Sequence, residues 1–182
     1  MTVPNFITTI RIILTPIFVI YLINDQIITG LILLIISGVS DGVDGLVARL
    51  FNQKSKLGAY LDPVADKIIL ISAFVTLTIK GFLPAWITVM VISRDIMILI
   101  GVLILFLNGM KINIRPAITS KITTCFQFIT LITVLSKDWF PKLQVYFPCL
   151  FYLTALFTII SFLQYMYHWF KLTWESKDPA EE

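Results

Sequence analysis

Charged side chains are scarce in this sequence of 182 residues. Asp, Glu, Lys and Arg together make up 14% of it, whereas 58% of the residues are hydrophobic. A soluble domain contains only about 45–50% apolar residues. The shortage of charge and the excess of apolar residues exclude an ordinary soluble fold, so we expect an integral membrane protein.

Cysteine and histidine are almost absent, with two cysteines and one histidine. Cys125 and Cys149 are far apart and each lies in an apolar run, so we expect buried thiols and no disulfide. His168 stands alone in YMYHWF near the end of the last apolar run, which favours an interfacial anchor over chemistry. The net charge of +3 comes mostly from the ends of apolar runs, so it indicates membrane topology and no nucleic-acid partner.

Six apolar runs are long enough to cross a bilayer, which requires about 20 residues. They cover approximately residues 5–24, 27–50, 60–80, 83–108, 118–136 and 144–170. We therefore predict an all-α integral membrane protein with six transmembrane helices. We expect one domain over residues 1–182, with a polar tail at 175–182, no cleavable secretory signal and no internal repeat.

The basic residues between the runs predict the orientation. One side, shared with the N-terminus, carries Lys54, Lys56, Lys111, Arg115, Lys171 and Lys177, and the other carries Lys80, Lys137 and Lys142. The excess marks the first side as cytoplasmic. Within the runs, Arg11 is interpreted as a snorkelling or phosphate-facing cation, and Lys67 as a snorkelling or pairing residue.

Four carboxylates interrupt the second and third runs. Asp41 and Asp44 are three residues apart and Asp62 and Asp66 are four apart, so on helices each pair shares one face. The segment between them, FNQKSKLGA, is typical of a short link between antiparallel helices, which would bring the two acidic faces together. Such a cluster must be neutralised in a low-dielectric site. Two Mg²⁺ or Mn²⁺ ions, which prefer oxygen ligands, would balance the four charges.

Three interpretations of this cluster are open. Paired metals could catalyse phosphoryl or phosphatidyl transfer, intramembrane carboxylates could form an ion or proton path, or the set could be structural ion pairs. Transport favours carboxylates spread over the bilayer depth and often an internal repeat, whereas these four lie at one level. A structural set needs cations at that level, and only Arg49 is near. The spacing therefore favours catalysis, with a membrane transporter as the alternative from another class.

The same stretch resembles the signature of the CDP-alcohol phosphatidyltransferases. That signature is Asp, two residues, Asp-Gly, two residues, Ala-Arg, a spacer, then Gly, three residues, Asp, three residues and Asp. Every fixed position is filled, by Asp41, Asp44, Gly45, Ala48, Arg49, Gly58, Asp62 and Asp66. The six-run layout and the opening PNFITTIR are also similar to the family.

The resemblance implies a reaction and a site. An alcohol hydroxyl would attack the lipid-side phosphorus of CDP-diacylglycerol and expel CMP. Asp41, Asp44 and Asp62 would be metal ligands, and Asp66 would share a metal and act as general base. The CDP pocket would be formed by Asp44, Gly45, Ala48, Arg49 and Gly58. The family also implies a homodimer, and we expect a bacterial inner (cytoplasmic) membrane with the active site facing the cytoplasm.

The signature specifies the donor but leaves the acceptor open. Arg94, Arg115 and Lys121 remain once Arg49 is assigned, and such a cluster suits an acceptor that carries its own phosphate. From the sequence we favour glycerol 3-phosphate, the simplest such acceptor, which gives phosphatidylglycerol phosphate. Phosphatidylglycerol, the substrate of a cardiolipin synthase, is the alternative, because ISRD and RPAITSK look somewhat like that branch. In addition, Asp95 follows Arg94, whereas phosphatidylglycerophosphate synthases more often have a Glu after the corresponding Arg. Inositol phosphate and serine are among the remaining candidate acceptors.

Overall fold

The computed structural model describes the backbone of residues 3–50, 58–107 and 118–175, and the side chains of 9–40, 67–101, 104, 118–167, 169 and 170. Its helices are α1 (Val3–Ile23), α2 (Ile27–Leu50), α3 (Gly58–Ile79), α4 (Ala85–Leu107), α5 (Ile118–Leu135) and α6 (Phe147–Glu175), with a short 3₁₀ helix, η1 (Pro141–Tyr146), before α6. These three ranges contain no strand. The all-α prediction is confirmed, and the helices follow the six apolar runs.

The outer faces of the helices are apolar. Large side chains such as Ile13, Ile79 and Val89 are more than half exposed, a surface that suits lipid and is unusual for a soluble monomer. Two described stretches, Ile118–Leu135 and Pro141–Tyr167, are long and apolar enough to cross a membrane, and Thr9–Ile23, Ile27–Ser40 and Lys67–Ile79 are shorter apolar helices. The fold is therefore that of a membrane protein, and six membrane crossings remain a prediction.

Two tight turns set the antiparallel pairing of consecutive helices. After α3, Gly81 has a φ of 73° and its N–H donates to the Thr78 carbonyl, while the Phe82 N–H donates to that of Leu77. This is the helix-ending pattern for which glycine is preferred. After α1, Asp25 has a φ of 60° and occupies the equivalent position, a conformation that Asp tolerates better than most side chains do.

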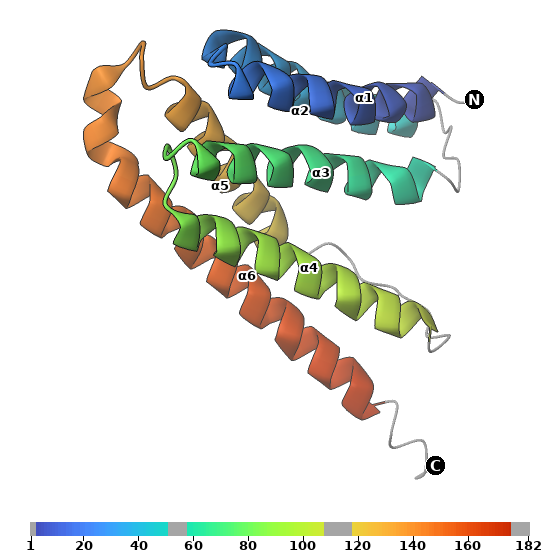
Figure 1. The fold of residues 1–182 in the computed structure, drawn as a ribbon. Coiled ribbons are helices and arrows are strands. Elements are labelled where there is room, and N and C mark those ends of the chain that lie inside the picture. Colours follow the sequence, from blue (N-terminus) through green and yellow to red (C-terminus); the bar gives the residue numbers. More distant parts are fainter. Residues whose placement is uncertain (1–2, 51–57, 108–117, 176–182) are drawn as a thin grey trace, which may run out of the picture.

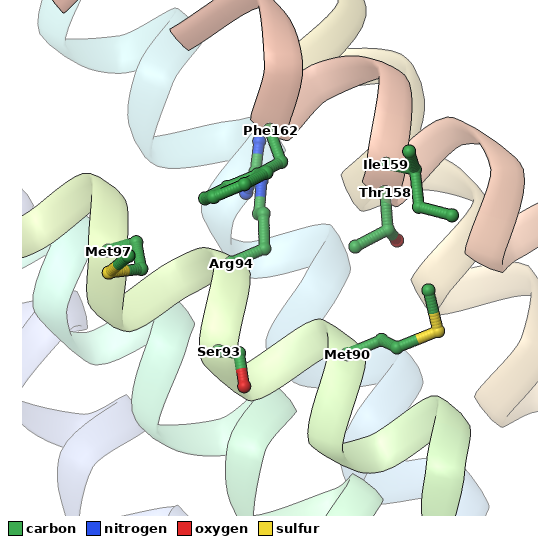
Figure 2. A pocket seen from close by; sticks show the side chains of 7 residues that line it. All are labelled: Met90, Ser93, Arg94, Met97, Thr158, Ile159 and Phe162. Carbon is green, nitrogen blue, oxygen red and sulfur yellow. The ribbon is translucent and has the colours of Figure 1, made fainter. Parts of the chain in front are cut away.

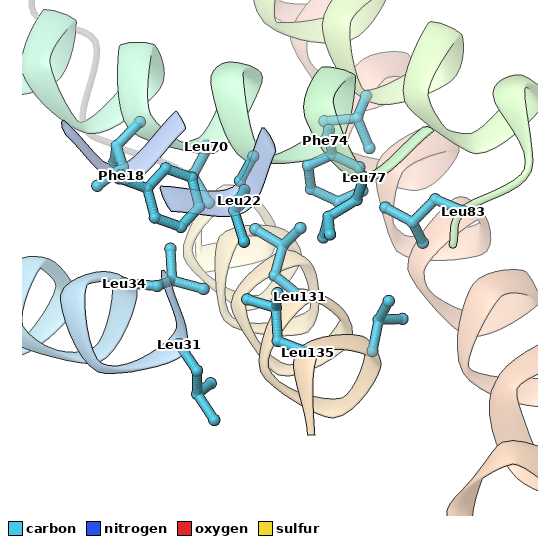
Figure 3. Packing of buried hydrophobic residues seen from close by; sticks show 14 of the residues in the cluster. Phe18, Leu22, Leu31, Leu34, Leu70, Phe74, Leu77, Leu83, Leu131 and Leu135 are labelled. Carbon is cyan, nitrogen blue, oxygen red and sulfur yellow. The ribbon is translucent and has the colours of Figure 1, made fainter. Parts of the chain in front are cut away.

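The apolar core lies where α1, α2, α3 and α5 meet. Figure 3 shows Phe18 and Leu22 of α1, Leu34 of α2, Phe74 of α3 and Leu131 of α5 converging there, and all five are fully buried. α1 packs against both α2 and α3, whereas α4 and α5 pack against α6. In Figure 1, α6 is the long helix that crosses the lower part of the molecule obliquely. The helices that bear the carboxylates therefore share α1 as a common support.

A glycine permits the close approach of α2 and α5. A Cβ atom at Gly38 would lie 3.1 Å from Cε1 of Phe128. Small residues allow helices to pack closely in a membrane, where association depends on van der Waals contact.

The cysteine prediction was half right. Cys125 and Cys149 are free, but both are exposed. The expectation of buried thiols was wrong because an apolar stretch in a membrane protein is in contact with apolar lipid outside as well as with apolar protein inside.

Candidate functional site

The carboxylates lie at the C-terminal end of α2 and the N-terminal end of α3, two consecutive helices. Asp41 and Asp44 lie in the last three turns of α2, and Asp62 and Asp66 in the first three turns of α3. Asp44 is about 9 Å and Asp62 about 6 Å from its helix end at 1.5 Å per residue. Asp44 and Asp62 thus lie at similar distances from their helix ends, and each spacing places the two positions of a pair on one helical face.

The remaining signature positions share the same two helices. Gly45, Ala48 and Arg49 lie in the last two turns of α2, and Gly58 begins α3. The side chains of residues 41–66 and the whole of Arg115 lie outside the described residues. Metal ligation, the CDP pocket and the contacts among these residues therefore stay predictions.

The donor set is chemically suited to hard cations. Its four members are all carboxylates, and oxygen ligands are those that Mg²⁺ and Mn²⁺ prefer. Among the described side chains there is no group of three or more His, Cys, Asp or Glu, so no competing metal cluster occurs in that part of the chain.

A buried group of charges and hydroxyls lies where α3, α4, α5 and α6 meet. Lys67 Nζ and Arg94 Nη1 both donate to Oδ1 of Asp95, at 2.7 and 2.6 Å. Arg94 Nη2 donates to the hydroxyls of Ser120 and Ser161, at 2.7 Å each. The Asp95 side chain has no exposed surface and that of Arg94 is 2% exposed. We call these five residues the ion centre.

The ion centre explains two charges in the middle of an apolar helix. An unpaired buried charge is strongly destabilising, whereas here Arg94 and Asp95 are paired with each other and contact side chains of three further helices. Asp95 Oδ2 is buried and has no hydrogen-bond partner among the described residues. Lys67 is a pairing residue, one of the two roles expected of it. The sequence did not reveal Ser120 and Ser161 as partners of Arg94. Hydroxyl side chains within apolar helices are the available signal, because they commonly bond across helices in membranes.

Arg94 also lines a cavity between α4 and α6. The cavity has a volume of about 200 Å³ and its other walls are Met90, Ser93, Met97, Thr158, Ile159 and Phe162. Figure 2 shows the Arg94 side chain extending from α4 toward α6. The Arg94 Nε atom is buried and has no hydrogen-bond partner among the described residues. The cavity is thus mostly apolar, with one guanidinium in its wall.

Two of the three predicted acceptor-phosphate cations, Arg94 and Lys121, are described by the structure. Arg94 donates to Ser120, and Lys121 is the next residue of α5 and is exposed. Arg115, outside the described residues, precedes this helix by three positions.

Arg11 is a further cation within an apolar helix whose side chain the structure describes. It is 2% exposed on α1, the helix that packs against both α2 and α3. Such burial is incompatible with a snorkelling side chain, whose charged head reaches water. Of its two expected roles, the phosphate-facing one remains a prediction.

Comparisons with known proteins point to one family. The family model for CDP-alcohol phosphatidyltransferases matches residues 1–171. The human protein named cardiolipin synthase (CMP-forming) is 30% identical, over 94% of this chain and 62% of its own length. A probable cardiolipin synthase of Drosophila melanogaster is 30% identical, over 91% of this chain and 57% of its own length. The chain thus spans about three-fifths of the length of these relatives. CDP-diacylglycerol--glycerol-3-phosphate 3-phosphatidyltransferase of Aquifex aeolicus is 32% identical, over 74% of this chain and 75% of its own length.

Proposed function

The chain belongs to the CDP-alcohol phosphatidyltransferase family, and on this premise we propose that it transfers the phosphatidyl group of CDP-diacylglycerol to an alcohol, with release of CMP. The observation that carries the proposal is the complete signature, which spans the end of α2 and the beginning of α3. A transporter would require neither the complete signature nor carboxylates that share one level.

The proposed mechanism gives each signature residue a task. Arg49 holds a phosphate of the donor, and Gly45, Ala48 and Gly58 leave room for the CDP group. The acceptor hydroxyl attacks the lipid-side phosphorus, its proton passes to Asp66, and the bond from that phosphorus to the CMP oxygen breaks. Two divalent ions, Mg²⁺ or Mn²⁺, held by Asp41, Asp44, Asp62 and Asp66, would supply neutralisation of the diphosphate charge when bound.

The proposed setting is a membrane crossed by all six helices. The excess of basic residues on the side of residues 51–57 supports a site that faces the cytoplasm. We place the protein, as a homodimer, in a bacterial inner membrane.

The proposed acceptor carries its own phosphate, because the sequence offers Arg94, Lys121 and Arg115 as cations beyond Arg49. Of two such acceptors we favour phosphatidylglycerol. The matches to proteins named cardiolipin synthase extend over 91–94% of this chain, and the apolar cavity beside Arg94 suits an acceptor with acyl chains. Glycerol 3-phosphate, which the sequence alone favours, is the second candidate and is supported by the Aquifex relative.

An acceptor screen tests both the class of reaction and the acceptor. Purified protein would receive labelled CDP-diacylglycerol, Mg²⁺ or Mn²⁺, and one alcohol at a time. We expect CMP release with cardiolipin as the product from phosphatidylglycerol. Phosphatidylglycerol phosphate formed from glycerol 3-phosphate would establish the second candidate. Ion flux into liposomes without any CMP would support the transporter and refute the proposal.

The acceptor cations give a second test. Arg115→Gln and Lys121→Gln should each lower kcat/KM for the acceptor and leave donor affinity unchanged. A charge-assisted hydrogen bond contributes about 1.5–3 kcal/mol, which corresponds to roughly 10- to 150-fold. Acceptor titrations at saturating CDP-diacylglycerol, beside donor titrations, measure the effect. Arg94→Gln should also lower kcat/KM for the acceptor, but this variant disrupts the ion centre as well.

Lys142→Gln is the matched control for these variants. Lys142 is exposed in η1, on the opposite side of the expected membrane, and the change removes the same charge. Its acceptor kinetics should equal those of the unmodified protein. Normal acceptor kinetics in both Arg115→Gln and Lys121→Gln would argue against a phosphate-bearing acceptor and in favour of a small uncharged alcohol.

A further inference from the structure

The ion centre includes Lys67 of α3, the helix that bears Asp62 and Asp66. Lys67 immediately follows Asp66 on the continuous helix α3 (Gly58–Ile79). Neighbouring positions on a helix are rotated by about 100°, so Lys67 occupies a different side of α3 from the face shared by Asp62 and Asp66. A contact that fixes Lys67 therefore fixes the rotation of the turn that carries Asp66.

The Lys67–Asp95 ion pair links α3 to α4 away from their connecting turn. The two helices diverge from that turn in Figure 1. Near the turn they are joined by the hydroxyls of Thr78 and Thr88, 2.6 Å apart. Lys67 lies about 16 Å further along α3 at 1.5 Å per residue. Among the described side chains, the ion pair is thus an α3–α4 link at the residue that follows Asp66 in the chain.

Asp95 is the point at which this link is anchored. One of its oxygens accepts from both Lys67 and Arg94. Arg94 is in turn held by Ser120 of α5 and Ser161 of α6, and its guanidinium lies 5.8 Å from the centre of the Tyr165 ring. Loss of the Asp95 charge would leave two cations close together, the buried Arg94 and the partly exposed Lys67, which would drive α3 away from α4.

We infer that Asp95 is a positioning residue: through its ion pair with Lys67 it fixes the rotation and depth of α3, and with them the positions of Asp62 and Asp66. The inference rests on the proposed function, in which those two carboxylates hold metal and remove a proton. Asp95 itself touches neither metal nor substrate in this role.

The test measures metal binding as well as turnover. Purified Asp95→Asn would be titrated with Mn²⁺ in detergent, with free Mn²⁺ followed by electron paramagnetic resonance, and assayed for CMP release. Residues that orient metal ligands typically change affinity or activity about 10- to 100-fold when altered, so we expect weaker Mn²⁺ binding and a lower kcat by about tenfold or more. Asp95→Glu, which keeps the charge, should recover most of both.

Lys67→Met tests the same ion pair from its partly exposed end, and it decides the question if Asp95→Asn does not fold. It should weaken Mn²⁺ binding in the same way. Because the inference assigns the effect on metal binding to the Lys67–Asp95 contact, the double variant should bind Mn²⁺ no worse than the more severe single variant. If the losses of Mn²⁺ affinity in the two single variants multiply in the double variant, the inference is overturned. It is also overturned if a folded single variant has normal Mn²⁺ affinity and normal kcat and only a lower thermal stability.

Thr78→Val is the matched control. It removes a polar contact between the same two helices at their other end, so Mn²⁺ affinity and kcat should stay unchanged even if the protein melts at a lower temperature. A control variant that loses Mn²⁺ affinity as severely as Asp95→Asn would show that any loosening of α3 and α4 has this effect, against a specific role of Asp95.

The unmodified protein separates failure of the proposed function from failure of this inference. If it binds Mn²⁺ but releases no CMP, the proposed function fails while the Mn²⁺ titrations still test Asp95. If it binds no Mn²⁺, both fail.

Discussion

Asp41→Asn, Asp44→Asn and Asp62→Asn should each abolish nearly all CMP release. Each change replaces a proposed ligand charge by a neutral amide of almost the same size, at a site where metals must neutralise the donor's diphosphate. Metal ions contribute several kcal/mol of charge stabilisation in such reactions. A loss of about 4 kcal/mol lowers turnover roughly 1,000-fold.

The measurement is CMP release by purified variants whose folding is verified by size-exclusion chromatography and melting temperature. EDTA should stop the reaction of the unmodified protein, and added Mg²⁺ or Mn²⁺ should restart it. Asp138→Asn is the matched control, because Asp138 is an exposed carboxylate in the segment between α5 and η1, on the other side of the expected membrane. A well-folded signature variant with normal turnover would refute the assignment of that residue as a ligand.

Asp66→Asn should lower kcat much more than it weakens binding of CDP-diacylglycerol. A general base is needed only while the acceptor hydroxyl attacks, so its loss affects the transition state and spares the bound donor. General base catalysis typically contributes about 10²–10⁴-fold, and the expected fall in kcat lies in that range.

Donor binding and turnover would be measured in parallel for Asp66→Asn and Asp62→Asn. Because Asp62 is proposed as a ligand only, its variant should lose metal affinity together with turnover. Equal losses of donor binding and turnover in Asp66→Asn would instead make Asp66 mainly a ligand, and the base would have to be sought elsewhere.

The sequence by itself determined the helices and the proposed chemistry. Apolar runs of about 20 residues can satisfy their backbone in lipid only as helices, so α5 was predicted at 118–136 and is observed at Ile118–Leu135. The third run was predicted at 60–80, and α3 ends at Ile79, shortly before Gly81 takes a positive φ. The signature from Asp41 to Asp66 lies within one short stretch of the chain, so its spacing can be recognised without knowing how the helices pack.

Only the tertiary structure decided which side chains meet across helices. Arg94 and Asp95 stand out in the sequence as charges in an apolar run, but Lys67, Ser120 and Ser161 become their partners through the packing of α4 with α3, α5 and α6. The exposed cysteines, Cys125 and Cys149, were beyond sequence reasoning for a related reason. In a membrane, lipid and protein interior are both apolar, so composition does not tell the buried face of a helix from its outer face, and burial is set by which helix packs against it.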